Sequence, residues 1–252
     1  QKCKICFFMI YQIADFYNNL QEDYFMLILI DDADLTKIEE LYNMYPYDGV
    51  TTNPTILSKT GNPNPMDQLK KIRALIPSDA MLHAQVLSTE ADDMVKEAKH
   101  MVSVLGENTY IKVPVTANGL KAISILSKEG INVTATAIYG VLPAFMAAKA
   151  GAKFLAPYVN RLDNLGYDGV QIAKDIHTMV KSAGYEAEVL GASFKNSQQV
   201  LEMGKFGIGS VTVNPDTLKA LAFNGVAETA VKDFIHDFEG CCGEGKTMLD
   251  FE

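Results

Sequence analysis

The chain has few cysteines, no cluster of basic residues and no glycine-rich phosphate loop, and each scarcity excludes a class of protein. Its four cysteines stand near the two ends, at positions 3, 6, 241 and 242 of 252. This is not the disulfide framework of a secreted fold, so we expect a reducing cytoplasm as its compartment. The formal net charge of -9 argues against nucleic acid and membrane surfaces as partners, because no cluster of basic residues is present to neutralise phosphates. A small anionic substrate needs only one or two local cations and remains compatible with this charge.

Residues 1–25 differ in character from the rest. They hold a short apolar run after two lysines, but the run is too short to span a bilayer and no convincing cleavage site follows it. We expect them to be an extension outside the fold, with Met26 as the true start. Cys3 and Cys6 have CxxC spacing, but without a second pair of ligands we predict neither a metal nor a redox role.

From Met26 onward, apolar strand-like runs alternate with amphipathic helical stretches. The runs recur roughly every 20 to 35 residues, as a βα repeat requires. The eight runs are 27–31, 49–53, 81–86, 109–113, 131–136, 153–159, 187–193 and 210–214. Glycine stands between a helical run and the next strand at Gly130, Gly151, Gly184 and Gly207, where it allows a positive φ.

The clearest helical stretch begins at Thr89. Asp92 is placed to complete a capping box with Thr89, and Gly106 follows the stretch as a left-handed cap. Its apolar positions share one helical face. They are Ala91, Met94, Val95, Ala98, Met101, Val102 and Leu105.

Eight strands alternating with helices form either a closed barrel or an open doubly wound sheet. An open nucleotide-binding sheet requires a glycine-rich turn after its first strand, and this chain has neither that turn nor a GxGxxG or P-loop motif. We therefore predict an α/β fold, a single-domain (β/α)8 TIM barrel over residues 26–252. The additional C-terminal helical run at 226–239 could dock on a neighbouring subunit. Cys241 and Cys242, beside two glycines, are predicted to lie in a surface loop.

Polar residues gather at the carboxyl ends of the predicted strands, where (β/α)8 barrels carry their active sites. They occur on seven consecutive strands, which predicts a site. These residues are Asp31, Thr51, Thr52, Asn53, Gln85, Lys112, Thr134, Thr136, Tyr158, Asn160, Arg161 and Ser193.

Lys112 is the most informative of them. It interrupts a strand that should be covered on both faces, and period-two alternation places it with Tyr110, opposite Ile111 and Val113. We expect its side chain to point into the barrel, where desolvation lowers the pKa and supplies the neutral amine of a carbonyl nucleophile. The alternative is a lysine paired to Asp31 or one that binds substrate phosphate as a cation.

Other candidates follow from the chemistry of such an amine. Schiff-base cleavage needs a proton shuttle, and Tyr158, Gln85 and Thr136 could hold a water for it; Tyr158 could instead cap the core. His83 has no visible partner and is interpreted as a wall residue.

A phosphate subsite is predicted from two further residues. Arg161 and Ser193 suit a phosphate, because a guanidinium binds its oxygens in a fork. The alternative for Arg161 is a salt bridge at the rim to Asp163.

Five motifs are long and ordered enough to compare with known families. They are GVTTNPTIL (49–57), YIKVPVTANGLKAI (110–123), ATAIYG (135–140), AGAKFLAPYVNRLD (150–163) and ASFK (192–195). In these motifs the chain resembles the small transaldolase family, and specifically its fructose-6-phosphate aldolase branch. The resemblance runs from about residue 26 to the C-terminus.

The resemblance implies a (β/α)8 barrel with its Schiff-base lysine at Lys112 and with neither a metal nor an organic cofactor. It further implies that Asp31 assists the amine, that Thr51 and Asn53 contact donor hydroxyls, and that Arg161 and Ser193 hold the acceptor phosphate. Thr134 is expected to contribute to substrate binding. Members of the family form pentamers and decamers in which the C-terminal helix packs on a neighbour, so we expect a homo-oligomer.

Two positions separate the branches of this family. Transaldolases resembling this chain carry glutamate in place of Gln85 and phenylalanine in place of Tyr158, whereas the aldolase branch has the residues found here. We expect reversible cleavage of fructose 6-phosphate to dihydroxyacetone and glyceraldehyde 3-phosphate. The alternatives are a transaldolase, a sugar-phosphate isomerase in which Lys112 acts only electrostatically, and a barrel that binds a sugar phosphate without catalysis. His83 departs from the aldolase pattern, which has phenylalanine there.

Overall fold

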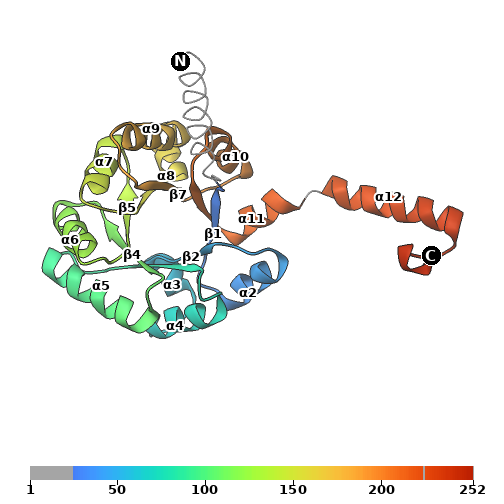
Figure 1. Cartoon of the computed structure of the whole chain (residues 1–252), viewed down its shortest axis with the longest axis horizontal. Coiled ribbons are helices and arrows are strands. Elements are labelled where there is room, and N and C mark those ends of the chain that lie inside the picture. Colours follow the sequence, from blue (N-terminus) through green and yellow to red (C-terminus); the bar gives the residue numbers. More distant parts are fainter. Residues whose placement is uncertain (1–24, 224, 252) are drawn as a thin grey trace, which may run out of the picture.

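The computed structural model describes residues 25–223 and 225–251. Eight parallel strands close into a barrel in the order of the sequence, and β8 pairs with β1 (Figure 1). The strands are β1 (Leu27–Asp31), β2 (Gly49–Thr51), β3 (Met81–Gln85), β4 (Thr109–Pro114), β5 (Val133–Ile138), β6 (Phe154–Pro157), β7 (Glu188–Gly191) and β8 (Ser210–Val213). The predicted (β/α)8 barrel is thereby confirmed.

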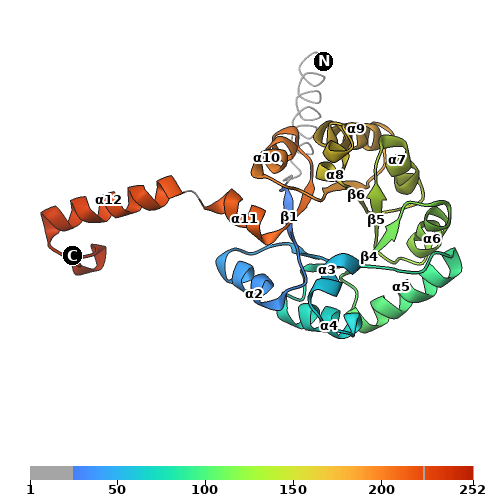
Figure 2. The same cartoon turned by 180° about the vertical axis from the view of Figure 1, so that it is seen from behind.

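Helices surround the barrel and connect each strand to the next, as the two opposite views in Figures 1 and 2 show. Two connections hold a pair of helices, after β2 and after β6. The helices are α2 (Leu35–Met44), α3 (Pro54–Lys59), α4 (Pro65–Leu75), α5 (Ala91–Leu105), α6 (Ala117–Lys128), α7 (Val141–Lys149), α8 (Val159–Asn164), α9 (Gly169–Ser182), α10 (Ser197–Phe206), α11 (Pro215–Ala222) and α12 (Gly225–Cys242), followed by the short 3-10 helix η1 (Met248–Asp250).

The core lies in two layers that follow from the alternation of side chains along each strand. Outward-facing residues such as Ile111 and Val113 are fully buried against the helices. Inside the barrel, Leu29, Phe154 and Leu190 form a separate apolar cluster with Tyr110 packed against it. The inward direction of Tyr110 and Lys112 on β4 therefore agrees with the prediction.

Several local predictions are confirmed. Gly130, Gly151, Gly184 and Gly207 all have positive φ. Of the seven apolar positions predicted for one face of α5, six are buried, and Val102 is half-buried.

Other local predictions are wrong. The capping box at Thr89 does not form, because α5 begins at Ala91 after Glu90, which makes no side-chain cap. Gly106 ends α5 with a positive φ of 93°, but its ψ of 178° lies outside the left-handed helical region, so the left-handed cap predicted there is wrong. Cys241 and Cys242 end helix α12 and do not lie in a loop. The sixth strand ends at Pro157, before its predicted limit, because Tyr158 already caps α8.

The C-terminal helix stands apart from the barrel. The run expected at 226–239 is the central part of α12, which has no buried residue and projects away from the other elements (Figures 1 and 2). Within the described part of the chain, no helix combines the length and hydropathy needed to cross a membrane. The predictions for Cys3 and Cys6, and for residues 1–24 as an extension, lie outside the described residues.

Candidate active site at the carboxyl ends of the strands

Lys112 is buried on β4, with only 5% of its surface exposed. Its Nζ donates a hydrogen bond of 2.7 Å to the carbonyl oxygen of Thr52, and not to Asp31 as one sequence interpretation held. Burial lowers the pKa of Lys112; the charge of Asp31 raises it in part, and that of Arg161 lowers it further. The net effect favours the uncharged amine, the form that can attack a carbonyl carbon.

Asp31, at the end of β1, is the acidic neighbour of this amine. Thr51 donates a hydrogen bond of 2.8 Å to Asp31 Oδ1, and its Oγ1 also lies 2.6 Å from Oγ1 of Thr212 on β8. Burial raises the pKa of Asp31, while the charge of Lys112 and the Thr51 hydrogen bond lower it. Burial thus favours the neutral forms of Asp31 and Lys112, while the charge of each group favours the charged form of the other.

Tyr158 lies directly after β6, at the N-cap position of α8. Its hydroxyl lies 2.9 Å from Oγ1 of Thr136, and the guanidinium of Arg161 lies 4.3 Å from the centre of its ring. Thr136 lies within an irregularity of β5, where the register with β6 shifts between Ala135 and Ile138 and Ala137 has a φ of 56°. Such a bulge redirects neighbouring side chains. Tyr158 is held by these two contacts and is not simply a cap on the core.

Arg161 does not form the rim salt bridge that was its alternative. Asp163 instead accepts hydrogen bonds from the amide of Gly169 and from the side chain of Gln199. Arg161 donates to the hydroxyl of Tyr139 at 3.4 Å, and this contact is the main reason that its pKa is raised. Its guanidinium has no carboxylate partner among the described residues, so it can bind an anion.

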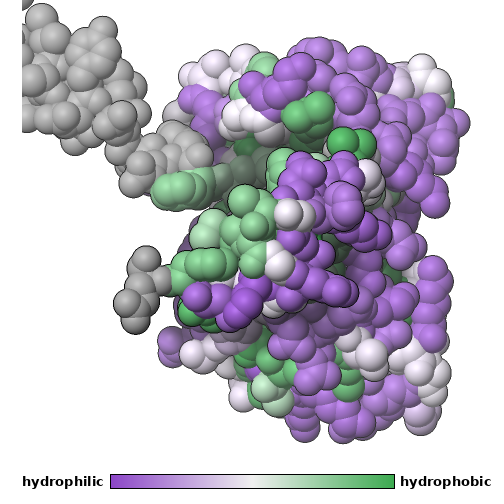
Figure 3. Space-filling view, turned by 90° about the vertical axis from the view of Figure 1, so that its right-hand side faces the viewer, coloured by the Kyte–Doolittle hydropathy of each residue, from purple (hydrophilic) through white to green (hydrophobic). Residues whose placement is uncertain are grey.

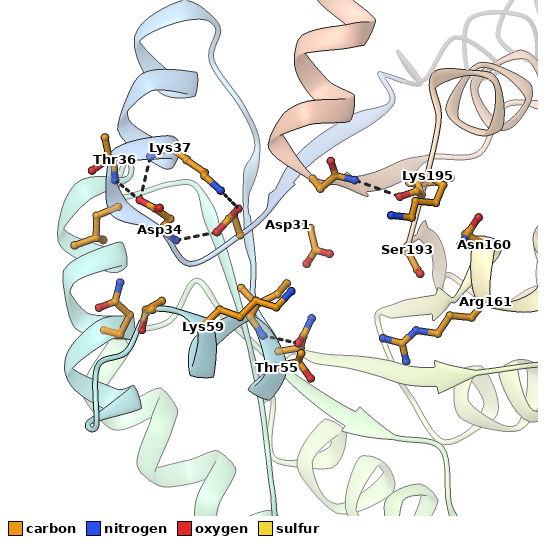
Figure 4. A pocket seen from close by; sticks show the side chains of 18 residues that line it. Asp31, Asp34, Thr36, Lys37, Thr55, Lys59, Asn160, Arg161, Ser193 and Lys195 are labelled. Atoms are coloured by element: carbon orange, nitrogen blue, oxygen red, sulfur yellow. Dashed lines mark hydrogen bonds and ion pairs between the residues drawn. The ribbon is translucent and has the colours of Figure 1, made fainter. Parts of the chain in front are cut away.

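A cavity of about 820 Å³ opens at this end of the barrel. Asp31, Asn53, Arg161 and Ser193 line it, and in Figure 4 the Arg161 guanidinium points across the cavity in the direction of Asp31, with Ser193 on the same side as Arg161. Lys112 is not part of the wall, but Asp31, whose charge acts on it, is. Asn160 lines the cavity as well, so five of the predicted polar residues share one open cavity.

Ser193 and Asn53 are positioned by backbone features. Ser193 has a φ of 63°, a left-handed conformation that costs a residue with a Cβ about 1–2 kcal/mol. Asn53 caps α3, since its side chain accepts from the amide of Ile56 at 3.0 Å. Strained backbone of this kind clusters at ligand sites.

The side-chain amide of Gln85 has an unsatisfied oxygen. Its Oε1 is buried and has no partner among the described residues. Gln85 also borders a second cavity of about 420 Å³, which has a largely apolar lining that includes Leu57 and Met66. An unpaired buried amide oxygen is suited to receive a water or a substrate hydroxyl.

His83 has a partner that the sequence did not reveal. Its Nδ1 lies 2.9 Å from Oγ1 of Thr134, and its ring stacks on Tyr110 with centroids 4.8 Å apart. Thr134 is therefore engaged with His83, and its expected contact with substrate stays a prediction.

The sequence did not predict Thr212 and Tyr139 as contributors to the site, nor the contact made by the backbone carbonyl of Thr52. The carbonyl of Thr52 receives the Lys112 amine, Thr212 completes the hydroxyl chain to Asp31, and Tyr139 holds Arg161. Thr212 carried the same signal as Lys112, a polar residue at an inward position of an apolar strand. A carbonyl partner such as that of Thr52 leaves no signal in the sequence.

Comparison with known proteins gives a single family. The model for the family described as Transaldolase/Fructose-6-phosphate aldolase matches residues 28–245. A probable transaldolase of Hydrogenobaculum sp. (strain Y04AAS1) is 36% identical over 214 residues, which are 85% of this chain and 97% of the relative. A probable fructose-6-phosphate aldolase of Streptococcus pneumoniae (strain ATCC 700669 / Spain 23F-1) is 36% identical over 213 residues, 84% of this chain and 96% of the relative. A probable transaldolase of Methanococcus maripaludis (strain C7 / ATCC BAA-1331) is 36% identical over 214 residues, 85% of this chain and 98% of the relative.

Proposed function

This chain belongs to the transaldolase/fructose-6-phosphate aldolase family, a family of enzymes, and we propose that it is a Schiff-base aldolase that reversibly cleaves fructose 6-phosphate. The products would be dihydroxyacetone and glyceraldehyde 3-phosphate. The observation that carries the proposal is the Lys112 amine, which is buried beside Asp31 and has a lowered pKa. The reaction needs neither a metal nor an organic cofactor, because the lysine itself supplies the electron sink.

The chemistry follows from this amine. The neutral Nζ of Lys112 attacks the ketone carbon of the sugar, and loss of water gives a cationic iminium. The C3–C4 bond then breaks, and its electron pair moves into the iminium to give an enamine. The C4 hydroxyl loses its proton at the same time, so that the fragment beginning at C4 leaves as the aldehyde. Protonation of the enamine carbon and addition of water then release dihydroxyacetone and regenerate the amine.

Proton transfers in these steps are assigned to a water held by Tyr158, Thr136 and Gln85. The hydroxyls of Tyr158 and Thr136 already lie in hydrogen-bond contact, and Gln85 Oε1 has an unmade bond. Asp31 is assigned to the proton exchange with Lys112, because both groups are buried and their charges interact. A positioned acid or base of this kind contributes about 10²- to 10⁴-fold to the rate.

Substrate contacts are assigned to residues around the cavity. Arg161 and Ser193 would hold the phosphate, for which a guanidinium without a carboxylate partner is suited. Thr51, Asn53 and Thr134 would contact hydroxyl groups of the donor. A hydroxyketone or sugar phosphate is then the partner of the site.

A transaldolase is the second candidate, and the names of the relatives divide between the two activities. A transaldolase must keep the dihydroxyacetone fragment on the lysine until an acceptor sugar arrives. The Tyr158 hydroxyl beside Thr136 favours the aldolase, because it can help protonate and release that fragment.

We also propose that the enzyme is a cytoplasmic homo-oligomer in which α12 docks on a neighbouring copy. Val231, Phe234 and Ile235 on this helix are each more than half exposed. Figure 3 looks onto the end of the molecule from which α12 projects, and hydrophobic and hydrophilic residues separate there onto different sides. Such an apolar surface on a projecting helix is typical of an interface.

The proposal is tested by trapping the intermediate. Dihydroxyacetone and borohydride should add a reduced adduct to Lys112 alone, detected by intact mass and peptide mapping, and Lys112→Met should give none. Absence of an adduct on the wild type would refute the mechanism.

A coupled assay with fructose 6-phosphate, with and without erythrose 4-phosphate, then separates the candidates, since only an aldolase turns over without an acceptor. An isomerase would leave the carbon chain whole, and a binding protein would show saturation without turnover.

A further inference from the structure

His83 is a buried polar residue that the proposed reaction does not use. It is fully buried on β3, two residues before Gln85. Its Nδ1 pairs with Thr134, whereas its Nε2 is buried and has no partner among the described residues. Leaving a buried polar atom unsatisfied costs about 1–3 kcal/mol. An apolar ring would avoid that cost, so the imidazole at this position calls for a reason.

The pair formed by His83 and Thr134 lies beside Lys112 in the strand register. In the strand register, Lys112 on β4 is opposite Gln85 on β3 and Thr134 on β5. The hydrogen bond between His83 and Thr134 therefore joins the two strands that flank β4. The imidazole stacks on Tyr110, which precedes Lys112 by two residues on the same inward face of β4.

The ring at this place is polar but uncharged. Burial, followed by the charge of Lys112, holds the pKa of His83 well below its ordinary value, so the imidazole is neutral. A neutral imidazole offers one donor and one acceptor, and only one of its nitrogens is used by Thr134. Its ring neighbours are the aromatic side chains of Tyr110 and Phe154.

We propose that His83 is a positioning residue that, together with Thr134, gives the barrel interior beside Lys112 a neutral polar layer that stabilises the cationic forms of its nitrogen. These forms are the ammonium of the free enzyme and the iminium of the intermediate, so the inference rests on the proposed function. The other charged groups that act on Lys112 are Asp31 from β1 and Arg161 from α8. The charge of Asp31 raises the pKa of Lys112 and that of Arg161 lowers it, so a neutral dipole nearby can change the resulting pKa.

The test measures the protonation of Lys112 directly. Wild type, His83→Phe and His83→Gln are labelled with trace acetic anhydride over a range of pH, and the acetylated Lys112 peptide is quantified by mass spectrometry. Because the phenylalanine removes the polar layer, we expect Lys112 to be neutral more often and to be labelled about tenfold faster below its pKa, which corresponds to one pKa unit. His83→Gln should return most of the wild-type profile. Tyr110→Phe, which keeps the stacked ring, is the matched control and should label like the wild type.

Superimposed profiles for wild type and His83→Phe would overturn the inference, as would a change of the same size in Tyr110→Phe. If His83→Phe does not fold, as judged by circular dichroism, Thr134→Val removes the other half of the pair and should shift the profile in the same direction; no shift would likewise overturn it. Labelling requires no turnover. A wild type that forms no borohydride adduct therefore refutes the proposed function, while a normal adduct with an unshifted His83→Phe profile refutes this inference alone.

Discussion

Replacing Lys112 with methionine tests both the chemistry and the energetics of the site. Methionine keeps an apolar stem of similar length in the barrel and removes the amine. Since the nucleophile is lost, we expect fructose 6-phosphate cleavage to fall by about four orders of magnitude or more, the scale seen when a covalent nucleophile is removed from an enzyme. The fold should persist, because the position is covered on all sides by residues that the substitution leaves in place.

The change in stability is the balance of two opposing terms. The variant loses the hydrogen bond to the Thr52 carbonyl, and a bond from a charged donor contributes about 1.5–3 kcal/mol. It also loses a buried amine whose charged form carries a desolvation penalty of several kcal/mol. We expect the two to offset each other within about 2 kcal/mol at neutral pH.

The stability of the variant relative to the wild type should change with pH in a direction that can be measured. The pKa of Lys112 in the folded chain lies below its ordinary value of 10.5. Between that lowered value and the pKa of the unfolded chain, the unfolded chain binds more protons, so the stability of the wild type rises with pH in this window. The variant lacks this contribution. Its stability relative to the wild type should therefore be greatest on the acid side of the window and should decline as pH rises.

The assay is urea unfolding of both proteins at several pH values, together with cleavage coupled to detection of glyceraldehyde 3-phosphate. Parallel stability curves for the two proteins across the window would refute the claim that burial shifts this amine. Residual turnover near the wild-type level would refute its role as nucleophile. Circular dichroism of the variant controls for loss of the fold.

Four further outcomes are expected. Tyr158→Phe should lower fructose 6-phosphate cleavage about 100-fold and lower transfer to erythrose 4-phosphate less, and an unchanged ratio of the two rates would contradict the role of the hydroxyl. Arg161→Met should raise KM for a phosphorylated acceptor about 10- to 100-fold in steady-state kinetics but not that for an unphosphorylated aldehyde. Ser193→Gly should raise the free energy of unfolding by up to about 1 kcal/mol, measured in urea, while it weakens acceptor binding, because glycine accepts a φ of 63° without strain. Phe234→Asp on α12 should reduce the mass found by light scattering, and an unaltered mass would argue against docking through this helix.

Local patterns predicted the strands and the inward direction of Lys112, because alternation along one strand is a property of that strand alone. The same patterns could not predict contacts that depend on closure of the barrel. Thr212 contacts Thr51 across β1 because β8 pairs with β1. His83 likewise contacts Thr134 across β4, from one flanking strand to the other. The predicted cap at Thr89 is wrong because α5 starts later than its local signal indicated.

The candidate site has to reconcile a buried amine with a cationic intermediate. Burial makes Lys112 a better nucleophile because it favours the neutral form, yet it also disfavours the iminium that forms once the amine has reacted. The carbonyl of Thr52 and the carboxyl of Asp31 oppose that second effect, and each is an acceptor that favours a positive nitrogen. Their strength must stay moderate, because a full ion pair with Asp31 would hold the lysine as an unreactive ammonium. The hydrogen bond from Thr51 to Asp31 keeps part of that carboxylate engaged elsewhere, so the amine can lose its proton before the reaction and regain a positive charge during it.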